Sequence, residues 1–91
     1  MPYIPVEARE ELDNSIENLA NSLTNEGEVN YAITRILSIA CGVSEPRYSK
    51  INKAIGILEC AKLEFYRRLA KYEDKKIDEN GDVYEYKESK V

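Results

Sequence analysis

Carboxylates are the side chains of this 91-residue chain that could do chemistry, because the chain has no histidine and only two cysteines. Without histidine, the commonest metal ligand and general base is absent, and no Ser–His or Cys–His nucleophile can form. The four glycines do not make a glycine-rich phosphate loop. The chemistry left open is a carboxylate site for magnesium, which takes oxygen ligands and could assist phosphoryl or pyrophosphoryl transfer.

Glu59 and Arg35 stand out among the charged residues because apolar residues flank each of them at helical spacing. A charge on a mostly apolar face must find a partner or lose its charge. The simplest arrangement is an interhelical ion pair between Arg35 and Glu59, or a surface pair of Glu59 with Lys62. The alternative is that Glu59 faces a polar cavity as a metal or substrate ligand.

Helices must position these residues, since apolar residues recur at intervals of three and four through most of the chain. The pattern predicts an all-α helical bundle of two shorter helices, over about residues 6–23 and 28–41, and one long helix from about residue 46 to at least residue 72. Residues 1–78 are expected to form a single domain, followed by a polar tail or short hairpin over 79–91. The Asn80-Gly81 pair could form the hairpin turn or end the long helix, and we favour the helix end or a frayed tail.

The predicted third helix is longer than one small chain can cover. At about 1.5 Å per residue it spans about 40 Å, and a chain of this length has only a thin core of its own. We therefore expect a homo-oligomer, a dimer or tetramer, with the excess apolar surface buried against a second copy. Gly56 lies inside this helix, where glycine costs about 1 kcal/mol relative to alanine. It is predicted to mark a helix crossing.

Composition narrows the partners and the location. The first residues do not resemble a signal peptide, and no run approaches the ~18 apolar residues of a membrane span, so a cytoplasmic protein without a membrane partner is expected. Residues 1–26 carry six acids and one base, whereas residues 27–72 carry four acids and eight bases. These segments could pack against each other, or the basic segment could bind phosphates. Nucleic acid is not expected, because the net charge is −4.

Several segments resemble a family of small uncharacterised archaeal, bacterial and phage proteins. They are Met1-Pro2-Tyr3-Ile4, the stretch Gly27 to Arg35, the run Glu59 to Tyr66, and the stretches 72–76 and 79–84. The resemblance covers nearly the whole chain. It implies a group without an established activity.

A more distant likeness is to the all-α nucleoside triphosphate pyrophosphatases, which include MazG-like enzymes. Those oligomers hold magnesium with a Glu-Glu-x-x-Glu helix and a Glu-x-x-Asp helix. Here Glu10 and Glu11 match the first motif, with Asn14 in place of its last Glu, and Glu28 matches the second, with Tyr31 in place of the Asp. The likeness implies a magnesium site that includes Glu11 and Glu28, to which Glu59 is a further candidate ligand.

Two functions follow from these observations. The first is a divergent, non-catalytic oligomeric relative of the nucleotide pyrophosphatases, which acts by assembly with itself or by binding a nucleotide. The second is a magnesium-dependent nucleoside triphosphate pyrophosphohydrolase. Carboxylates gathered around one cavity would favour the enzyme, whereas carboxylates directed outward, with Glu59 bound to Arg35, would favour the binding or structural protein.

Overall fold

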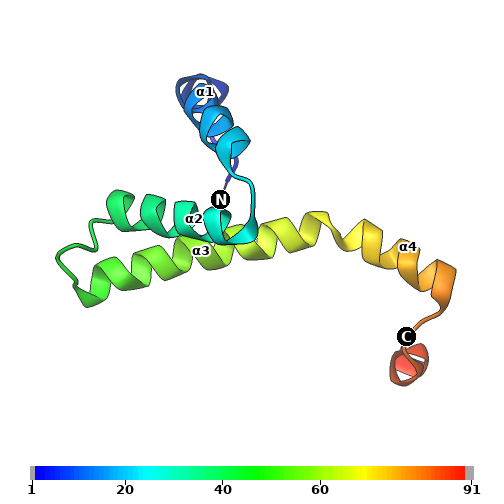
Figure 1. Ribbon diagram of the computed structural model, residues 1–91. Helices are drawn as coiled ribbons and strands as arrows, with labels where there is room; N and C mark the ends of the chain where they lie inside the picture. Colours follow the sequence, from blue (N-terminus) through cyan, green and yellow to red (C-terminus); the bar gives the residue numbers. More distant parts are fainter. Residues whose placement is uncertain (1, 90–91) are drawn as a thin grey trace. The chain divides into compact units, whose positions relative to one another are not determined.

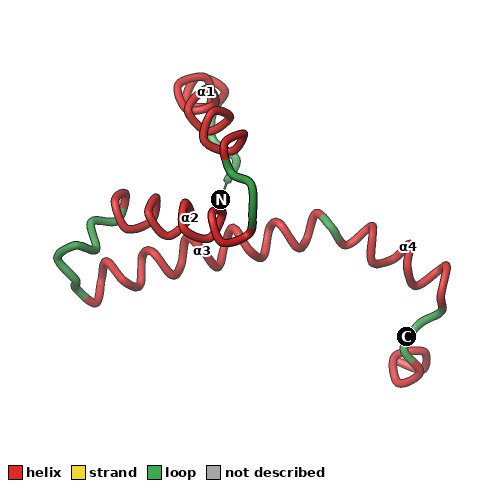
Figure 2. The backbone as a smooth tube through the Cα atoms, viewed as in Figure 1, coloured by secondary structure: helices red, strands yellow, loops and turns green. Residues whose placement is uncertain are grey.

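The computed structural model describes residues 2–89 of the chain, with side chains for residues 2–86. All of the regular structure in this range is helical, which confirms the predicted class (Figures 1 and 2). The elements are α1 (Val6–Ser22), α2 (Glu26–Ala40), α3 (Tyr48–Arg68), α4 (Ala70–Asn80) and a final 3-10 helix, η1 (Tyr84–Ser89).

The chain divides into two compact units, Met1–Ala61 and Lys62–Val91. In the first unit α2 and α3 lie side by side, whereas α1 stands apart from this pair (Figure 1). Gly42, just past the end of α2, has a φ of 64°, which is typical of a glycine that ends a helix. The first unit thus offers a pair of packed helices and one separate helix. The proposed single domain over residues 1–78 stays a prediction.

The link between α1 and α2 is short and held by side-chain hydrogen bonds. Leu23 is extended (φ −86°, ψ 130°), and Asn25 follows as the N-cap of α2. The Asn25 side chain accepts a hydrogen bond from the backbone N–H of Glu28 at 2.9 Å. This bond satisfies one of the unpaired N–H groups at the start of a helix, so it fixes where α2 begins.

The long helix of the prediction is interrupted once, so the expectation of an unbroken helix to Tyr72 was wrong. At Leu69 the backbone tightens, because the N–H of Leu69 donates to the carbonyl of Tyr66 and the N–H of Tyr72 donates to the carbonyl of Leu69. Such i to i+3 bonds are typical of 3-10 geometry. No glycine or proline marks the interruption in the sequence.

The second unit ends its helix at the Asn-Gly pair. Gly81 takes a φ of 89° and its N–H donates to the carbonyl of Ile77 at 2.7 Å. A positive φ is easy for glycine and typical of a residue just past a helix. The favoured reading of Asn80-Gly81 as a helix end is therefore confirmed, and no strand forms among the described residues.

Very little of the apolar surface is buried. Among the described residues the buried hydrophobic side chains are those of Ala32 and Cys41, while large apolar side chains of every helix remain exposed. None of the described helices combines the length and apolar character that a membrane span needs. The helices are therefore amphipathic elements whose apolar faces are mostly uncovered within one chain.

The cap at Asn25 gives a direct test of the link. Asn25→Ala should lower the free energy of unfolding by about 1 kcal/mol, because it leaves the N–H of Glu28 without its acceptor. The matched control is Asn14→Ala, an exposed asparagine within α1, which should not destabilise because alanine favours a helix. Urea unfolding followed by circular dichroism would compare the two. Equal losses would contradict the role of the cap.

Candidate functional site

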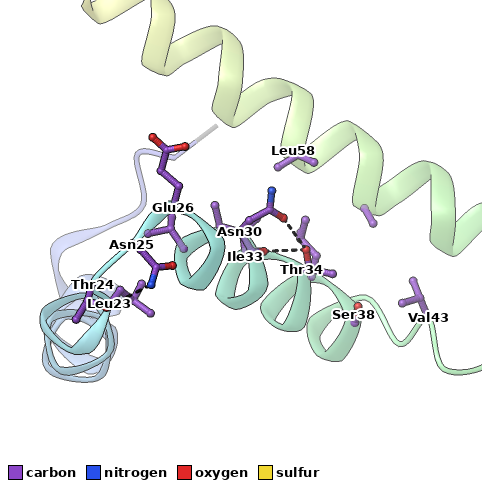
Figure 3. A pocket seen from close by; sticks show the side chains of 13 residues that line it. Leu23, Thr24, Asn25, Glu26, Asn30, Ile33, Thr34, Ser38, Val43 and Leu58 are labelled. Carbon is purple, nitrogen blue, oxygen red and sulfur yellow. Dashed lines mark hydrogen bonds between the residues drawn. The ribbon is translucent and has the colours of Figure 1, made fainter.

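A groove between α2 and α3 forms a concave surface of the first unit (Figure 3). It has a volume of about 780 Å³ and ends at the link between α1 and α2. The lining residues come from the link, from one face of α2, from the loop after it and from α3. They are Leu23, Thr24, Asn25, Glu26, Val29, Asn30, Ile33, Thr34, Leu37, Ser38, Val43, Ala54 and Leu58.

The walls of this groove are mainly apolar, and three of its polar residues form a stripe along α2. Asn30, Thr34 and Ser38 follow each other at one-turn spacing. The Thr34 hydroxyl donates to the backbone carbonyl of Asn30 at 2.8 Å (Figure 3). Among the described lining residues, the charged one is Glu26. An apolar groove whose charged residue is acidic favours the binding of an apolar helical surface and disfavours the binding of a phosphate group.

Glu28 does not line the groove but serves the start of α2. Its carboxylate accepts hydrogen bonds from the backbone N–H of Thr24 at 2.7 Å and from the Thr24 hydroxyl at 2.9 Å. Both bonds favour the charged form, first the backbone bond and then the hydroxyl bond, so they hold the pKa of Glu28 below its ordinary value of 4.5. The residue expected to bind magnesium thus has an oxygen already engaged within the chain.

The other expected metal ligands do not join Glu28. Among the described residues no three Asp, Glu or Cys side chains come close enough together to hold a metal ion, so one chain does not gather Glu11, Glu28 and Glu59. Asn14 and Tyr31 also lack the carboxylates of the magnesium motifs. Within the part of the chain that the structure describes, these residues therefore do not form a ready set of magnesium ligands. A magnesium site at these residues stays a prediction.

Arg35 contacts its own helix. Its guanidinium donates to the Tyr31 hydroxyl at 3.3 Å and lies 6.0 Å from the centre of that ring. A cation over an aromatic face is weakly attractive at an exposed site. The interhelical pair of Arg35 with Glu59 stays a prediction. Tyr31, which stands where the pyrophosphatase motif has an Asp, is therefore a neighbour of Arg35 on the surface of α2.

Gly56 lines a second, smaller hollow of about 400 Å³ on α3, next to Pro2 and Cys60. A Cβ atom built on Gly56 would meet nothing within 4 Å outside its own helix backbone. No described helix of the same chain therefore crosses α3 closely at this point. The predicted crossing at Gly56 would require a helix of another copy, and it stays a prediction.

Two features of this region were missed in the sequence. Asn25 followed by Glu three residues later is the spacing of a capping box, and it would have placed the start of α2 at Glu26 instead of Glu28. Here Glu28 reaches back to Thr24, one residue before the cap. The groove was missed for another reason. Periodicity identifies the apolar face of a helix, but it does not show whether a neighbouring helix covers that face.

The lowered pKa of Glu28 predicts a pH-dependent helix start. A group whose pKa is lowered by folding stabilises the folded state at pH values above its pKa in the unfolded chain. This contribution is lost as the pH falls through its pKa in the folded chain. The amide of Thr24 should therefore lose protection from hydrogen exchange as the pH drops from 4.5 downward. Glu28→Gln should remove the pH dependence, while Glu26→Gln, without bonds to Thr24, should keep it. An unchanged profile in Glu28→Gln would contradict the assignment.

Comparison with known proteins gives a family and no activity. Residues 1–83 match a family described as a domain of unknown function, DUF6899. No curated protein and no solved structure matches the chain. The likeness to the all-α nucleoside triphosphate pyrophosphatases therefore stays a hypothesis. The match covers almost the whole chain, in agreement with the expected resemblance to a group without an established activity, and the protein belongs to the DUF6899 family.

Proposed function

We propose that the protein works as a homo-oligomeric helical assembly and not as an enzyme, with the groove between α2 and α3 as a contact surface between copies. The observation that carries this proposal is the exposure of the apolar faces. Val29 and Ile33 on α2 and Leu58 on α3 all line the groove, and each remains more than 40 % exposed. Large apolar side chains at such density mark a protein–protein contact.

The exposed area supports the same proposal. Leu12 and Ile16 of α1 and Ile36 of α2 are also about half exposed. Obligate homo-oligomers bury between about 2,000 and 5,000 Å² in an interface, and much of this area is apolar. At about 25 cal/mol per Å² of apolar surface, this burial is a substantial driving force for association.

A nucleotide is a weaker candidate for the groove. Nucleotide phosphates are held by basic side chains or by backbone N–H groups, and the described lining of the groove contains no lysine or arginine. We propose that the protein is a divergent relative of the all-α nucleotide pyrophosphatases, in which the oligomeric assembly is retained. Magnesium-dependent release of pyrophosphate from a nucleoside triphosphate would favour the enzyme and contradict this proposal.

Sedimentation equilibrium at micromolar concentration should show a dimer or larger species, because the uncovered faces associate. Ile33→Asp, which places a carboxylate inside the groove, should weaken association at least tenfold, since burying an unpaired charge is costly. The matched control is Ile39→Asp, the same change at an exposed position of α2 outside the groove. A wild-type monomer of 10.4 kDa would contradict the proposal, and equal effects of both variants would contradict the groove as the contact.

The crossing at Gly56 belongs to the same proposal as a second contact between copies. Leucine favours a helix over glycine by about 0.8 kcal/mol, so Gly56→Leu on an open surface would raise the melting temperature. If a helix of another copy crosses here, the added side chain should cost about 1–3 kcal/mol through overpacking. We expect a lower melting temperature and weaker association, measured by calorimetry and sedimentation. A raised melting temperature would refute the crossing.

A further inference from the structure

Helix α1 and the groove are two apolar surfaces of the same unit that do not cover each other. Every residue of α1 except Ala8 is exposed, including Leu12, Ile16 and Leu19 on its apolar stripe. None of the described lining residues of the groove belongs to α1. Within the first unit, neither surface covers the other.

We propose that α1 of one copy packs into the α2–α3 groove of a second copy, and that the exchange is reciprocal. This inference rests on the proposed homo-oligomer and names the segment that fills its contact surface. Exchange of an identical element between copies is a low-cost route to a dimer, because each contact can be satisfied twice.

The shape of α1 fits a groove between two helices. Its apolar residues Ala8, Leu12, Ile16 and Leu19 follow the spacing of three and four that a helix presents when it lies in an apolar groove. With 17 residues against the 15 of α2, α1 is about 25 Å long at 1.5 Å per residue. It can therefore run along the whole of α2 and cover the apolar wall that α2 and α3 leave open.

The conformation of the link between α1 and α2 decides whether α1 packs into the groove of its own copy or into that of a second copy. Leu23 and Asn25 are both extended, and three hydrogen bonds among Thr24, Asn25 and Glu28 hold the backbone at this point. With this geometry α1 leaves from the end of the groove and does not turn back over it (Figures 1 and 3). Occupation of its own groove would require the extended backbone angles of Leu23, which direct α1 away from that groove, to change. Occupation of the partner's groove leaves them intact.

Charge sets the direction of the exchanged helix. The first two-thirds of α1 is acidic, with five acidic residues and Arg9 as its base. The basic residues Arg47, Lys50 and Lys53 lie at the start of α3, and Lys50 approaches Gly42 just past the end of α2. An α1 that lies antiparallel to the partner's α2 places its acidic part beside these basic residues. Complementary charge of this kind fixes orientation more than affinity.

Disulfide trapping in the full-length chain tests the exchange. In a Cys41→Ala, Cys60→Ala background that sediments like the wild type, one chain carries Ile33→Cys and a second carries Leu12→Cys, Ile16→Cys or Leu19→Cys in turn. Mixing and mild oxidation should give a covalent heterodimer for at least one of the three positions. Asn14→Cys, on the polar face of α1, is the matched control and should give at least fivefold less.

The same trapping separates the possible failures. A chain with both Ile33→Cys and the reactive α1 substitution should cross-link between copies. A bond only within that chain, while the protein still sediments as an oligomer, would overturn the exchange and leave the proposed assembly intact. An oligomer without a cross-link at any of the three positions would do the same. A monomeric protein would overturn both.

A second measurement does not depend on cysteine geometry. Ile16→Glu should raise the dissociation constant of the assembly at least tenfold, because it introduces a charge into the apolar contact. Asn14→Glu adds the same charge on the opposite face of α1 and should change the constant less than twofold. Equal effects, measured by sedimentation with the helix content checked by circular dichroism, would overturn the exchange.

Discussion

The apolar faces of these helices are mostly uncovered among the described residues, and the proposed assembly and exchange both depend on this constraint. Two small or medium side chains, Ala32 and Cys41, are the buried hydrophobic groups among the described residues. Isolated helices of this length are only marginally stable in water, and packing of the apolar face normally supplies most of the stability of a helix in a protein. Further contacts would stabilise such helices, and the groove between α2 and α3 is where we propose that a second copy supplies them.

The helical class and the ends of most helices could be predicted because they depend on local chemistry. Gly42 and Gly81 end α2 and α4 with positive φ, and glycine is the residue type that sequence reasoning places just past a helix. The interruption at Leu69 could not be predicted, since no residue near it disfavours a helix. The start of α2 was misplaced by two residues because the capping role of Asn25 was overlooked.

The candidate site was predicted less well than the fold, and the reason is physical. Glu28 was chosen for the charge of its carboxylate, but that charge bonds to Thr24 at the start of α2. A carboxylate in the first turn of a helix is stabilised by the unpaired N–H groups there, with or without a metal. Sequence spacing alone cannot separate these two roles. The pairing of Glu64 with Arg67, by contrast, depends only on one turn of helix, so its spacing can be read directly from the sequence.

The absence of any buried residue within α1 has a consequence for the lifetime of the protein in a cell. A solitary amphipathic helix of 17 residues opens readily, because its backbone hydrogen bonds are exposed to water and no packing holds them closed. Under the proposed exchange, a newly made copy that has not met another presents this opened segment to proteases, while a paired copy hides it. The amount of the protein would then govern its own turnover, and unpaired copies would be removed first.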